Sequence, residues 1–250
     1  MDILQLFNRP TADITNPTNV TSRPSLSFDV HERLYCTLGE VCKVMDVDDK
    51  IVESFTSSDG LPFVAIATPT ETSDAQVRRR FVCATTKAIH IYKQHDPDEP
   101  PSLALKKIPL ATINVVGAVP VSQRILSVTL FGPNQEHVAL LTTQSKGCVV
   151  VYLDLMRQTN MHPGTPDHCW GTRAELGQPT ILCGSSFEQE IIIVNPEKCQ
   201  FVCYDVKGTM LSTWLEYGGK NKEIVVTAAT VDDGNRLNVA FHEHGMTSGS

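Results

Sequence analysis

Two short runs in this chain combine residue types that could perform chemistry. The run His242-Glu243-His244 places two imidazoles on one face of a strand, and these could begin a metal site. A closed zinc site needs three or four ligands, so the pair alone predicts no metal centre. The run Asp167-His168-Cys169-Trp170 holds an acid, a base and a thiol within a segment rich in proline and glycine. Catalytic groups must converge in space, which a contiguous run in a loop seldom achieves, so we predict no cysteine nucleophile.

The sequence contains no motif typical of cofactor binding or phosphate chemistry. There is no glycine-rich phosphate loop, paired-carboxylate motif or nucleophile elbow, so we expect a protein that is not an enzyme and carries no cofactor. One basic run remains, Arg78-Arg79-Arg80, directly before an apolar stretch. We predict that this run begins a strand, so that its side chains alternate between the two faces. It is either a contact for a phosphate or a partner, or a solvated edge that discourages pairing with other strands.

The elements that position these residues follow a repeated pattern. Four stretches share an apolar run, a polar break and a second apolar run that ends at a charge: Leu34–Asp46, Phe81–Lys93, Val138–Asp154 and Ile191–Asp205. A fifth begins at Asn235. The charged ends lie about 45–60 residues apart, close to the period of propeller blades with loop insertions. Repeats of this kind bury their faces by stacking on their neighbours.

Turn-forming residues separate the expected strands, and helical periodicity is almost absent. Turns or breaks are predicted at Asp48-Asp49, His95–Pro101, Gly132–Glu136, Lys207-Gly208 and Asp232–Asn235, and the longest irregular segment at Arg157–Gln178. We therefore predict an all-β fold, a WD40-like β-propeller that is incomplete, with about five blades of the seven that such repeats often form. Residues 1–24, rich in Pro, Thr and Asn, are expected to form a flexible arm, and residues 25–250 the blades.

Composition narrows the choice of partners. The 250 residues contain 21 basic and 28 acidic side chains, a net charge of −7, which argues against broad nucleic-acid binding and a polybasic membrane anchor. The first residues lack a basic lead and a long apolar core, and no run approaches the length of a membrane helix, so we expect a cytoplasmic protein. Most of the 8 cysteines lie in apolar runs, where we expect reduced, buried thiols. Trp170 and Trp214 are expected to pack in the fold rather than to serve as binding platforms.

The order of the segments resembles that of the PROPPIN family, the seven-bladed phosphoinositide-binding propellers of autophagy. Ser25–Cys36 looks like that family's opening strand pair, and Val77–Tyr92 is similar to its basic pair followed by a strand. Lys146–Leu155 is similar to its glycine, apolar strand and Asp-Leu segment, and Ile191–Gly218 matches the register of the blade that carries the family's motif. The resemblance covers most of residues 25–245. It implies a propeller that acts in autophagy or endolysosomal membrane trafficking.

The chain departs from the family at that motif. The family reads aromatic or leucine, Arg, Arg, Gly, whereas this chain reads Leu215-Glu216-Tyr217-Gly218. Each arginine of the pair neutralises a separate headgroup, and a glutamate there would repel phosphate. The resemblance therefore implies weak or absent phosphoinositide binding at these four residues. Nearby lysines either rebuild a weaker basic patch or are solvated loop residues: Lys198, Lys207, Lys220 and Lys222.

Two functional hypotheses follow. The first is a PROPPIN-like scaffold that holds protein partners on its propeller loops and makes peripheral contact with endosomal or autophagic membranes through phosphoinositide. The alternative is a general WD-repeat-like module for protein–protein interaction with no lipid role, favoured by the missing arginine pair and the acidic balance. Neither hypothesis includes nucleic acid.

Overall fold

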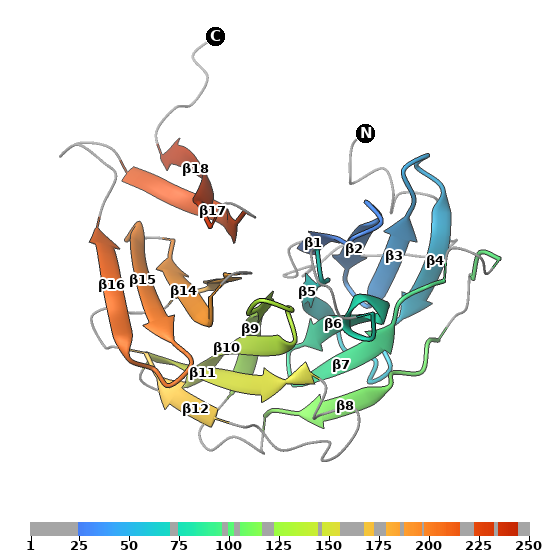
Figure 1. Ribbon diagram of the computed structural model, residues 1–250, viewed down its shortest axis with the longest axis horizontal. Coiled ribbons are helices and arrows are strands. Elements are labelled where there is room, and N and C mark those ends of the chain that lie inside the picture. The colour runs from blue at the N-terminus through green and yellow to red at the C-terminus, as the bar shows by residue number, and fades with distance from the viewer. Residues whose placement is uncertain are drawn as a thin grey trace, which may run out of the picture.

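In the computed structural model, the strands form five antiparallel sheets arranged around a common centre (Figure 1). The structure describes residues 25–70, 75–96, 100–102, 106–116, 123–144, 147–155, 168–172, 179–185, 188–196, 198–215, 223–232 and 235–244. The arm expected at residues 1–24 lies outside this part of the chain and stays a prediction.

The first two sheets have four strands each. The first contains β1 (Ser25–Phe28), β2 (Leu34–Leu38), β3 (Val41–Met45) and β4 (Ile51–Thr56). The second contains β5 (Phe63–Ala67), β6 (Arg80–Thr85), β7 (Ala88–Lys93) and β8 (Ala111–Asn114), with one turn of 3-10 helix, η1 (Val77–Arg79), before β6.

The remaining three sheets continue the series. The third contains β9 (Arg124–Phe131), β10 (His137–Gln144), β11 (Gly147–Asp154) and β12 (His168–Gly171). The fourth contains β13 (Ile181–Gly184), β14 (Glu190–Asn195), β15 (Gln200–Asp205) and β16 (Met210–Leu215). Among the described residues the fifth has two strands, β17 (Glu223–Val231) and β18 (Leu237–His244).

The repeat seen in the sequence is the central hairpin of each blade. The four predicted stretches form β2–β3, β6–β7, β10–β11 and β14–β15, and the fifth stretch supplies β18. Within each four-stranded sheet the strands follow one another in sequence order, from the innermost strand to the outermost (Figure 1). This is the radial order of a propeller blade.

Alternating side chains of each blade pack against both neighbours. In β6, Phe81 and Cys83 join the apolar cluster between the first and second sheets, whereas Val82 and Ala84 join the cluster between the second and third. In β14, Ile191 and Ile193 face the third sheet, and Ile192 and Val194 face the fifth. The core is therefore a series of layers between successive blades, as the period-2 pattern of the strands requires.

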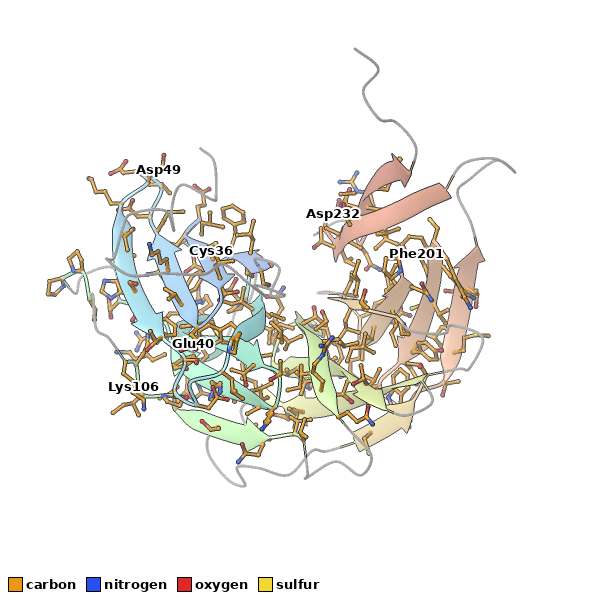
Figure 2. All side chains as sticks on the ribbon, turned by 180° about the vertical axis from the view of Figure 1, so that it is seen from behind. Cys36, Glu40, Asp49, Lys106, Phe201 and Asp232 are labelled. Carbon is orange, nitrogen blue, oxygen red and sulfur yellow. The ribbon has the colours of Figure 1, made fainter. Side chains whose placement is uncertain are left out.

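The ring is open. Its inner strands run in the order β1, β5, β9, β13 and β17, and the first and last sheets border the opening (Figure 1). Figure 2 places Cys36 of the first sheet and Asp232 of the last on opposite sides of this opening. The predicted all-β, incomplete propeller is confirmed.

The connection between β7 and β8 returns to the first blade. Ser102 pairs with Glu53 and Lys106 with Thr56, both in parallel, so this segment lies along the outer edge of β4. The amide of Ser54 donates to the carbonyl of Ser102 over 3.0 Å, and the amide of Ser102 donates to the carbonyl of Val52 over 2.9 Å. An edge strand that would present bare backbone groups is thereby covered.

The turns lie at the positions that their residues predicted, but the structure of two segments differs from the prediction. The amides of Gln135, Gly208 and Asn235 close the turns at Gly132, Asp205 and Asp232. The basic run does not begin a strand as a whole, because Arg78 and Arg79 lie in η1 and Arg80 alone opens β6. The segment expected to be irregular at 157–178 contains β12, since residues 168–171 pair with β11.

Candidate functional site

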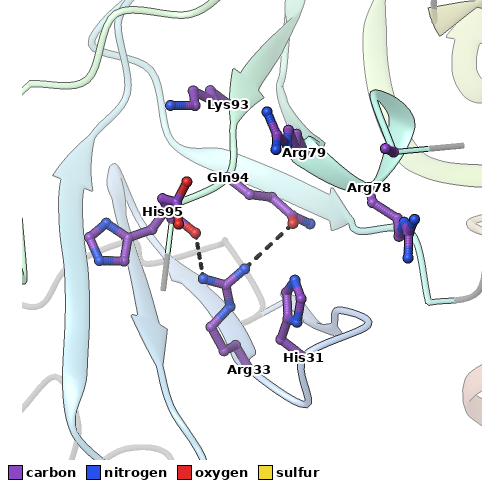
Figure 3. Close-up of a pocket in the computed structure, with 9 residues that line it drawn as sticks. His31, Arg33, Arg78, Arg79, Lys93, Gln94 and His95 are labelled. Carbon is purple, nitrogen blue, oxygen red and sulfur yellow. Dashed lines mark hydrogen bonds between the residues drawn. The ribbon is translucent and has the colours of Figure 1, made fainter. Parts of the chain in front are cut away.

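A basic pocket of about 220 Å³ lies between the first two blades (Figure 3). The structure brings together here Arg78 and Arg79 from η1, Lys93 from the end of β7, and His31 and Arg33 from the β1–β2 turn. Gln94, His95 and Asp96, which follow β7, complete the lining together with Ala75. Two of the three arginines predicted from the sequence thus line one pocket, and Arg80 does not.

The short helix η1 sets the position of the two arginines. Its first residue, Val77, is fully buried in the apolar cluster between the second and third sheets, which fixes the turn. The carbonyl of Arg79 accepts a hydrogen bond from the amide of Gln94 over 2.7 Å, so the helix is tied to the strand end that forms the pocket floor. The side chains of Arg78 and Arg79 remain exposed at the rim.

The floor of the pocket is built around Arg33. Its guanidinium pairs with the buried carboxylate of Asp29 over 2.7 Å, and Asp29 also accepts the amides of His31 and Arg33. The same guanidinium donates to the carbonyl of His95 over 2.6 Å and to Oε1 of Gln94 over 3.5 Å (Figure 3). A buried charge needs such pairing because isolated burial is costly.

Gln94 has one donor with no partner. The residue is 5% exposed, and its Nε2 is buried without a hydrogen bond, while its Oε1 accepts from Arg33. A buried polar atom left unpaired costs free energy, and native proteins leave few of them. The pocket therefore holds an unused hydrogen-bond donor at its base.

The motif position suggested by the family resemblance falls largely outside the described part of the chain. Leu215 ends β16, the outermost strand of the fourth sheet, and its backbone pairs with Gln200. Glu216, Tyr217 and Gly218 are not described, nor are Lys220 and Lys222, so this candidate site stays a prediction. Lys198 precedes β15 and Lys207 follows it, which places these two lysines at opposite ends of one strand rather than in one patch.

The base and the thiol of the predicted run lie in an outer strand, whereas Asp167 lies outside the described residues and the side chain of His168 is not described. His168, Cys169 and Trp170 belong to β12, and Cys169 is exposed. Trp170 packs on Tyr204 in a tilted arrangement with ring centroids 4.7 Å apart, and its Nε1 donates to the carbonyl of Val206 over 3.2 Å. Its expected packing role is confirmed. A Cβ at Gly208, whose φ is +83°, would lie 2.7 Å from the Trp170 ring, so glycine is required beneath the indole.

The two histidines of the other run lie in β18, where His242 pairs with Val225 and His244 with Glu223. Across the described residues, no three His, Cys, Asp or Glu side chains gather as metal ligands. The side chain of Trp214 is not described. Buried thiols were expected, and Cys36, Cys42, Cys83, Cys183, Cys199 and Cys203 are buried and free.

A second polar cluster, which sequence reasoning missed, joins the β4–β5 loop to the second blade. Nδ1 of His90 lies 3.0 Å from Oγ of Ser58 and 3.1 Å from Oγ1 of Thr112, and its Nε2 lies 3.3 Å from Asp59. Thr85 donates to Asp59 over 2.8 Å. The residue types match a hydrolytic triad, but His90 is 0% exposed. No substrate atom can reach its ring, so the cluster fastens the loop to the blade.

The charge states of this cluster are set by burial and hydrogen bonds. Burial lowers the pKa of His90, and the nearby Asp59 opposes this without reversing it. For Asp59, burial would raise the pKa, but hydrogen bonds from Thr85 and from the amide of Leu61 outweigh it and lower the pKa. At neutral pH the pair is a neutral imidazole beside a carboxylate.

The inner strands enclose a larger cavity of about 1220 Å³ at the centre of the open ring. Its lining combines hydroxyl-bearing and small apolar side chains from β1, β5, β9, β13, β17 and β18, with Arg124 as a charged member. Serine side chains of β1 satisfy the inner edge of β5, because Ser25 accepts the amide of Ile66 and Ser27 accepts the amide of Thr68, each over 3.1 Å.

No helix among the described residues has the length and apolar character to cross a bilayer.

Sequence reasoning found the two rim arginines and missed the rest of the basic pocket. His31 and Arg33 carried a signal, since Asp29 and Arg33 are spaced as a turn closed by an ion pair. Gln94 carried none, because its role depends on where η1 and the β1–β2 turn meet the end of β7.

Comparison with known proteins identifies the fold. No protein-family model matches the chain, and no curated protein matches its sequence. Solved structures do match. The β-propeller domain of Cps50 (Swd1) from Myceliophteria thermophila is 11% identical over 87% of this chain and 65% of that structure, with a TM-score of 0.58. The fold is a WD40-like β-propeller.

Two further propellers agree with this assignment. Raptor from Chaetomium thermophilum is 15% identical, with a TM-score of 0.55, over 87% of this chain and 18% of that one. The WD40 domain of Toxoplasma gondii coronin is 13% identical, with a TM-score of 0.53, over 87% of this chain and 54% of that one. The chain spans less than two thirds of each of these three structures. At such identities the likeness concerns architecture alone.

Proposed function

We propose that this chain is a non-enzymatic scaffold that holds protein partners on the rim of its open propeller. The observation that carries the proposal is the basic pocket between the first two blades, which presents exposed cationic side chains around a buried, unused donor. Loops supported by a rigid sheet scaffold are frequent sites of recognition. The described part of the chain offers no accessible cluster of nucleophile and base beside this pocket.

We propose further that the scaffold acts in autophagy or endolysosomal membrane trafficking, as a divergent relative of the PROPPIN propellers. The order of segments from Ser25 to Gly218 supports this role. Glu216 and Tyr217, which stand in place of the arginine pair, argue for weak or absent phosphoinositide binding. The same two residues favour the second candidate, a general WD-repeat-like interaction module with no lipid role.

Affinity purification of the tagged full chain from its own cells, with cross-linking mass spectrometry, tests the scaffold role. We expect partners in near-stoichiometric amount, cross-linked to Lys93 or to other lysines of the first two blades. An isolated chain that recovers no such partner would contradict the proposal. Recovered partners without any membrane-trafficking protein would favour the general interaction module.

Flotation of phosphatidylcholine vesicles, with and without phosphatidylinositol 3-phosphate, tests the lipid part. We expect little difference between the two vesicle types. Strong binding that requires the phosphoinositide would overturn the inference drawn from Glu216. A Glu216→Arg, Tyr217→Arg variant provides the comparison, since it restores the two arginines that the family motif contains.

A further inference from the structure

We propose that the apolar cluster Ile3–Phe7 docks on the free face of the first blade and covers the middle of that face. The free face is the side of the first sheet that is turned away from the second blade and toward the opening of the ring (Figure 1). The proposal goes beyond the scaffold role and does not depend on it, because it concerns a contact within one chain.

The alternation of side chains along the strands shows which residues form the free face. In β2, Tyr35 belongs to the apolar cluster between the first and second sheets, so its neighbours Leu34 and Cys36 point to the opposite side. In β3, Val44 belongs to the same cluster and Met45, which pairs with Leu34, points away from it. The strand β1 pairs with β2 and adds its alternate residues to this face. Five apolar side chains of the free face are Leu26, Phe28, Leu34, Cys36 and Met45.

Two of these side chains are buried although no described blade lies over them. Cys36 is 0% exposed and Met45 is 1% exposed, yet neither belongs to any of the four apolar clusters between successive blades. On the innermost strand, Leu26 and Phe28 are 43% and 56% exposed. The middle of the free face is therefore shielded from water, whereas its inner margin is not.

The segment that precedes β1 has the composition and the reach to provide this cover. Residues 1–24 contain one apolar cluster, Ile3–Phe7, and are otherwise rich in Pro, Thr and Asn. The tether between this cluster and Ser25 has 17 residues. A flexible linker of that length spans roughly 20–25 Å. Four strands spaced about 4.8 Å apart form a sheet about 15 Å wide, so the cluster can reach every strand of the face.

Tethering favours this occupant over a segment from another molecule. A short linker holds a segment near its target at an effective concentration in the millimolar range. The side chains of Ile3–Phe7 gain free energy when they leave water, and the face that receives them is itself apolar. A second copy or a separate partner would have to reach the same concentration to compete. Contact within the chain is therefore preferred.

Thiol labelling tests the proposal, because Cys36 lies on the covered face. The full chain is treated with N-ethylmaleimide, and the modified cysteines are identified over time by mass spectrometry of peptides. The double variant Leu6→Asp, Phe7→Asp removes the apolar contact, and Cys36 should then be labelled at least about fivefold faster. Cys42 and Cys83 are buried between the first two blades and should stay unmodified, which shows that these blades remain folded.

A matched control and a rescue experiment separate docking from a general effect of charge. Thr11→Asp, Thr15→Asp adds the same two charges within the tether and should leave the labelling rate of Cys36 unchanged. A synthetic peptide of residues 1–9, added at millimolar concentration to the Leu6→Asp, Phe7→Asp chain, should slow the labelling again. The same peptide with aspartate in place of Leu6 and Phe7 should have no effect.

Three results would overturn the proposal. The first is labelling of Cys36 in the original chain as fast as that of the exposed Cys169, which would show an open face. The second is an equal labelling rate of Cys36 in the original chain and in Leu6→Asp, Phe7→Asp, which would mean that another element covers the face. The third is protection of Cys36 that is lost on dilution, which would assign the cover to a second copy. Each leaves the scaffold role intact, because recovery of partners is measured separately.

Discussion

Lys107 lies where two blades and a loop meet, and its charge is matched by one buried acid. Its Nζ lies 2.5 Å from Oε1 of Glu53 and 5.4 and 5.2 Å from the ring centroids of Phe55 and Phe81. The side chain of Glu53 is 7% exposed, so the carboxylate has little access to water. The lysine holds the β7–β8 connection against the first blade and neutralises that acid.

Replacing Lys107 should therefore show how much a buried Glu53 carboxylate without its partner destabilises the folded chain. Lys107→Met keeps an apolar stem over the rings and leaves Glu53 buried without a partner, and we expect a loss of about 3–5 kcal/mol in the free energy of unfolding. Urea unfolding followed by circular dichroism measures it. The double variant Lys107→Met, Glu53→Gln should recover much of the loss. A single variant as stable as the original chain would mean that the pair contributes nothing.

The His90 cluster predicts how stability depends on pH. The unfolded chain takes up a proton at the ordinary imidazole pKa of 6.5, whereas burial lowers the pKa of His90 in the folded chain. The unfolded state therefore binds more protons below that pH, so this contribution is complete above 6.5 and is lost as the pH falls through it. The pKa of Asp59 is also lowered in the folded chain, so its contribution to stability is lost in more acidic solution, below about 3.8, the ordinary pKa of an aspartate.

A histidine substitution isolates the first of these losses. Between pH 7 and 5, the fall in the free energy of unfolding should be smaller in His90→Gln than in the original chain. His31→Gln, at an exposed position, is the control and should leave the slope unchanged. Parallel stability curves for His90→Gln and the original chain would show that His90 does not cause the pH dependence.

At the scale of elements, the third and fourth blades approach so closely that one residue must be glycine. A Cβ at Gly184 of β13 would lie 2.5 Å from Cβ of Phe131 and 2.6 Å from the carbonyl oxygen of Leu130. The blades are joined beside it, where the amide of Gly132 donates to the carbonyl of Ser185 over 2.8 Å. The added Cβ would meet a backbone carbonyl and the Cβ of Phe131, and neither atom can move without shifting the backbone.

Gly184→Ala should therefore cost about 1–3 kcal/mol in the free energy of unfolding, through overpacking at this interface. Thermal unfolding measures the change. Gly39→Asn is the matched control, because its φ of +58° suits asparagine and no atom lies within 4 Å of the added Cβ. A Gly184→Ala variant no less stable than the control would show that the two blades can separate freely.

The sequence predicted the central hairpins of the blades because their two strands are buried on both faces and close in the chain. It did not predict β12, whose four residues follow prolines and glycines and owe their conformation to pairing with β11. The helix η1 was missed because Arg78 and Arg79 read as an alternating strand edge, whereas burial of Val77 requires a turn there. The basic pocket was likewise predicted only in part. Charges visible in the sequence marked the rim of the pocket, but the floor at Gln94 depends on tertiary contacts.

For the whole molecule, stability is a sum over neighbouring blades. Each apolar cluster lies between two successive sheets, and among the described residues the fifth sheet packs on the fourth through residues that include Val226 and Val239. In such arrays each unit is stabilised by its own contacts and by those with its neighbours. The last sheet should therefore open independently of the rest.

Val226→Asp tests this independence, since Val226 is 1% exposed and a buried carboxylate there is costly. Amide hydrogen exchange should show faster exchange in residues 223–244, with the first three blades unchanged. Thr230→Asp introduces the same charge at an exposed position of the same strand and should change little. Loss of protection in the first blade as well would show that the ring unfolds as one unit.

Two aromatic side chains of the first and last sheets lie in water. Phe28 in the first sheet is 56% exposed and Phe241 in the last is 53% exposed. Exposed aromatic residues at sheet faces favour self-association. The double variant Phe28→Ser, Phe241→Ser should remain monomeric to higher concentration than the original chain, as measured by light scattering during size-exclusion chromatography. An unchanged concentration dependence would place the association surface elsewhere.

The backbone pairing of Ser102 and Lys106 with β4 has a consequence for the order in which the molecule is made. Ser102 and Lys106 pair with the outer edge of the first blade, yet the ribosome must add β5, β6 and β7 before these two residues exist. A nascent first blade therefore leaves the tunnel with its outermost backbone bare. Until its successor is synthesised, it depends on chaperones or on speed of translation to avoid joining a neighbouring chain.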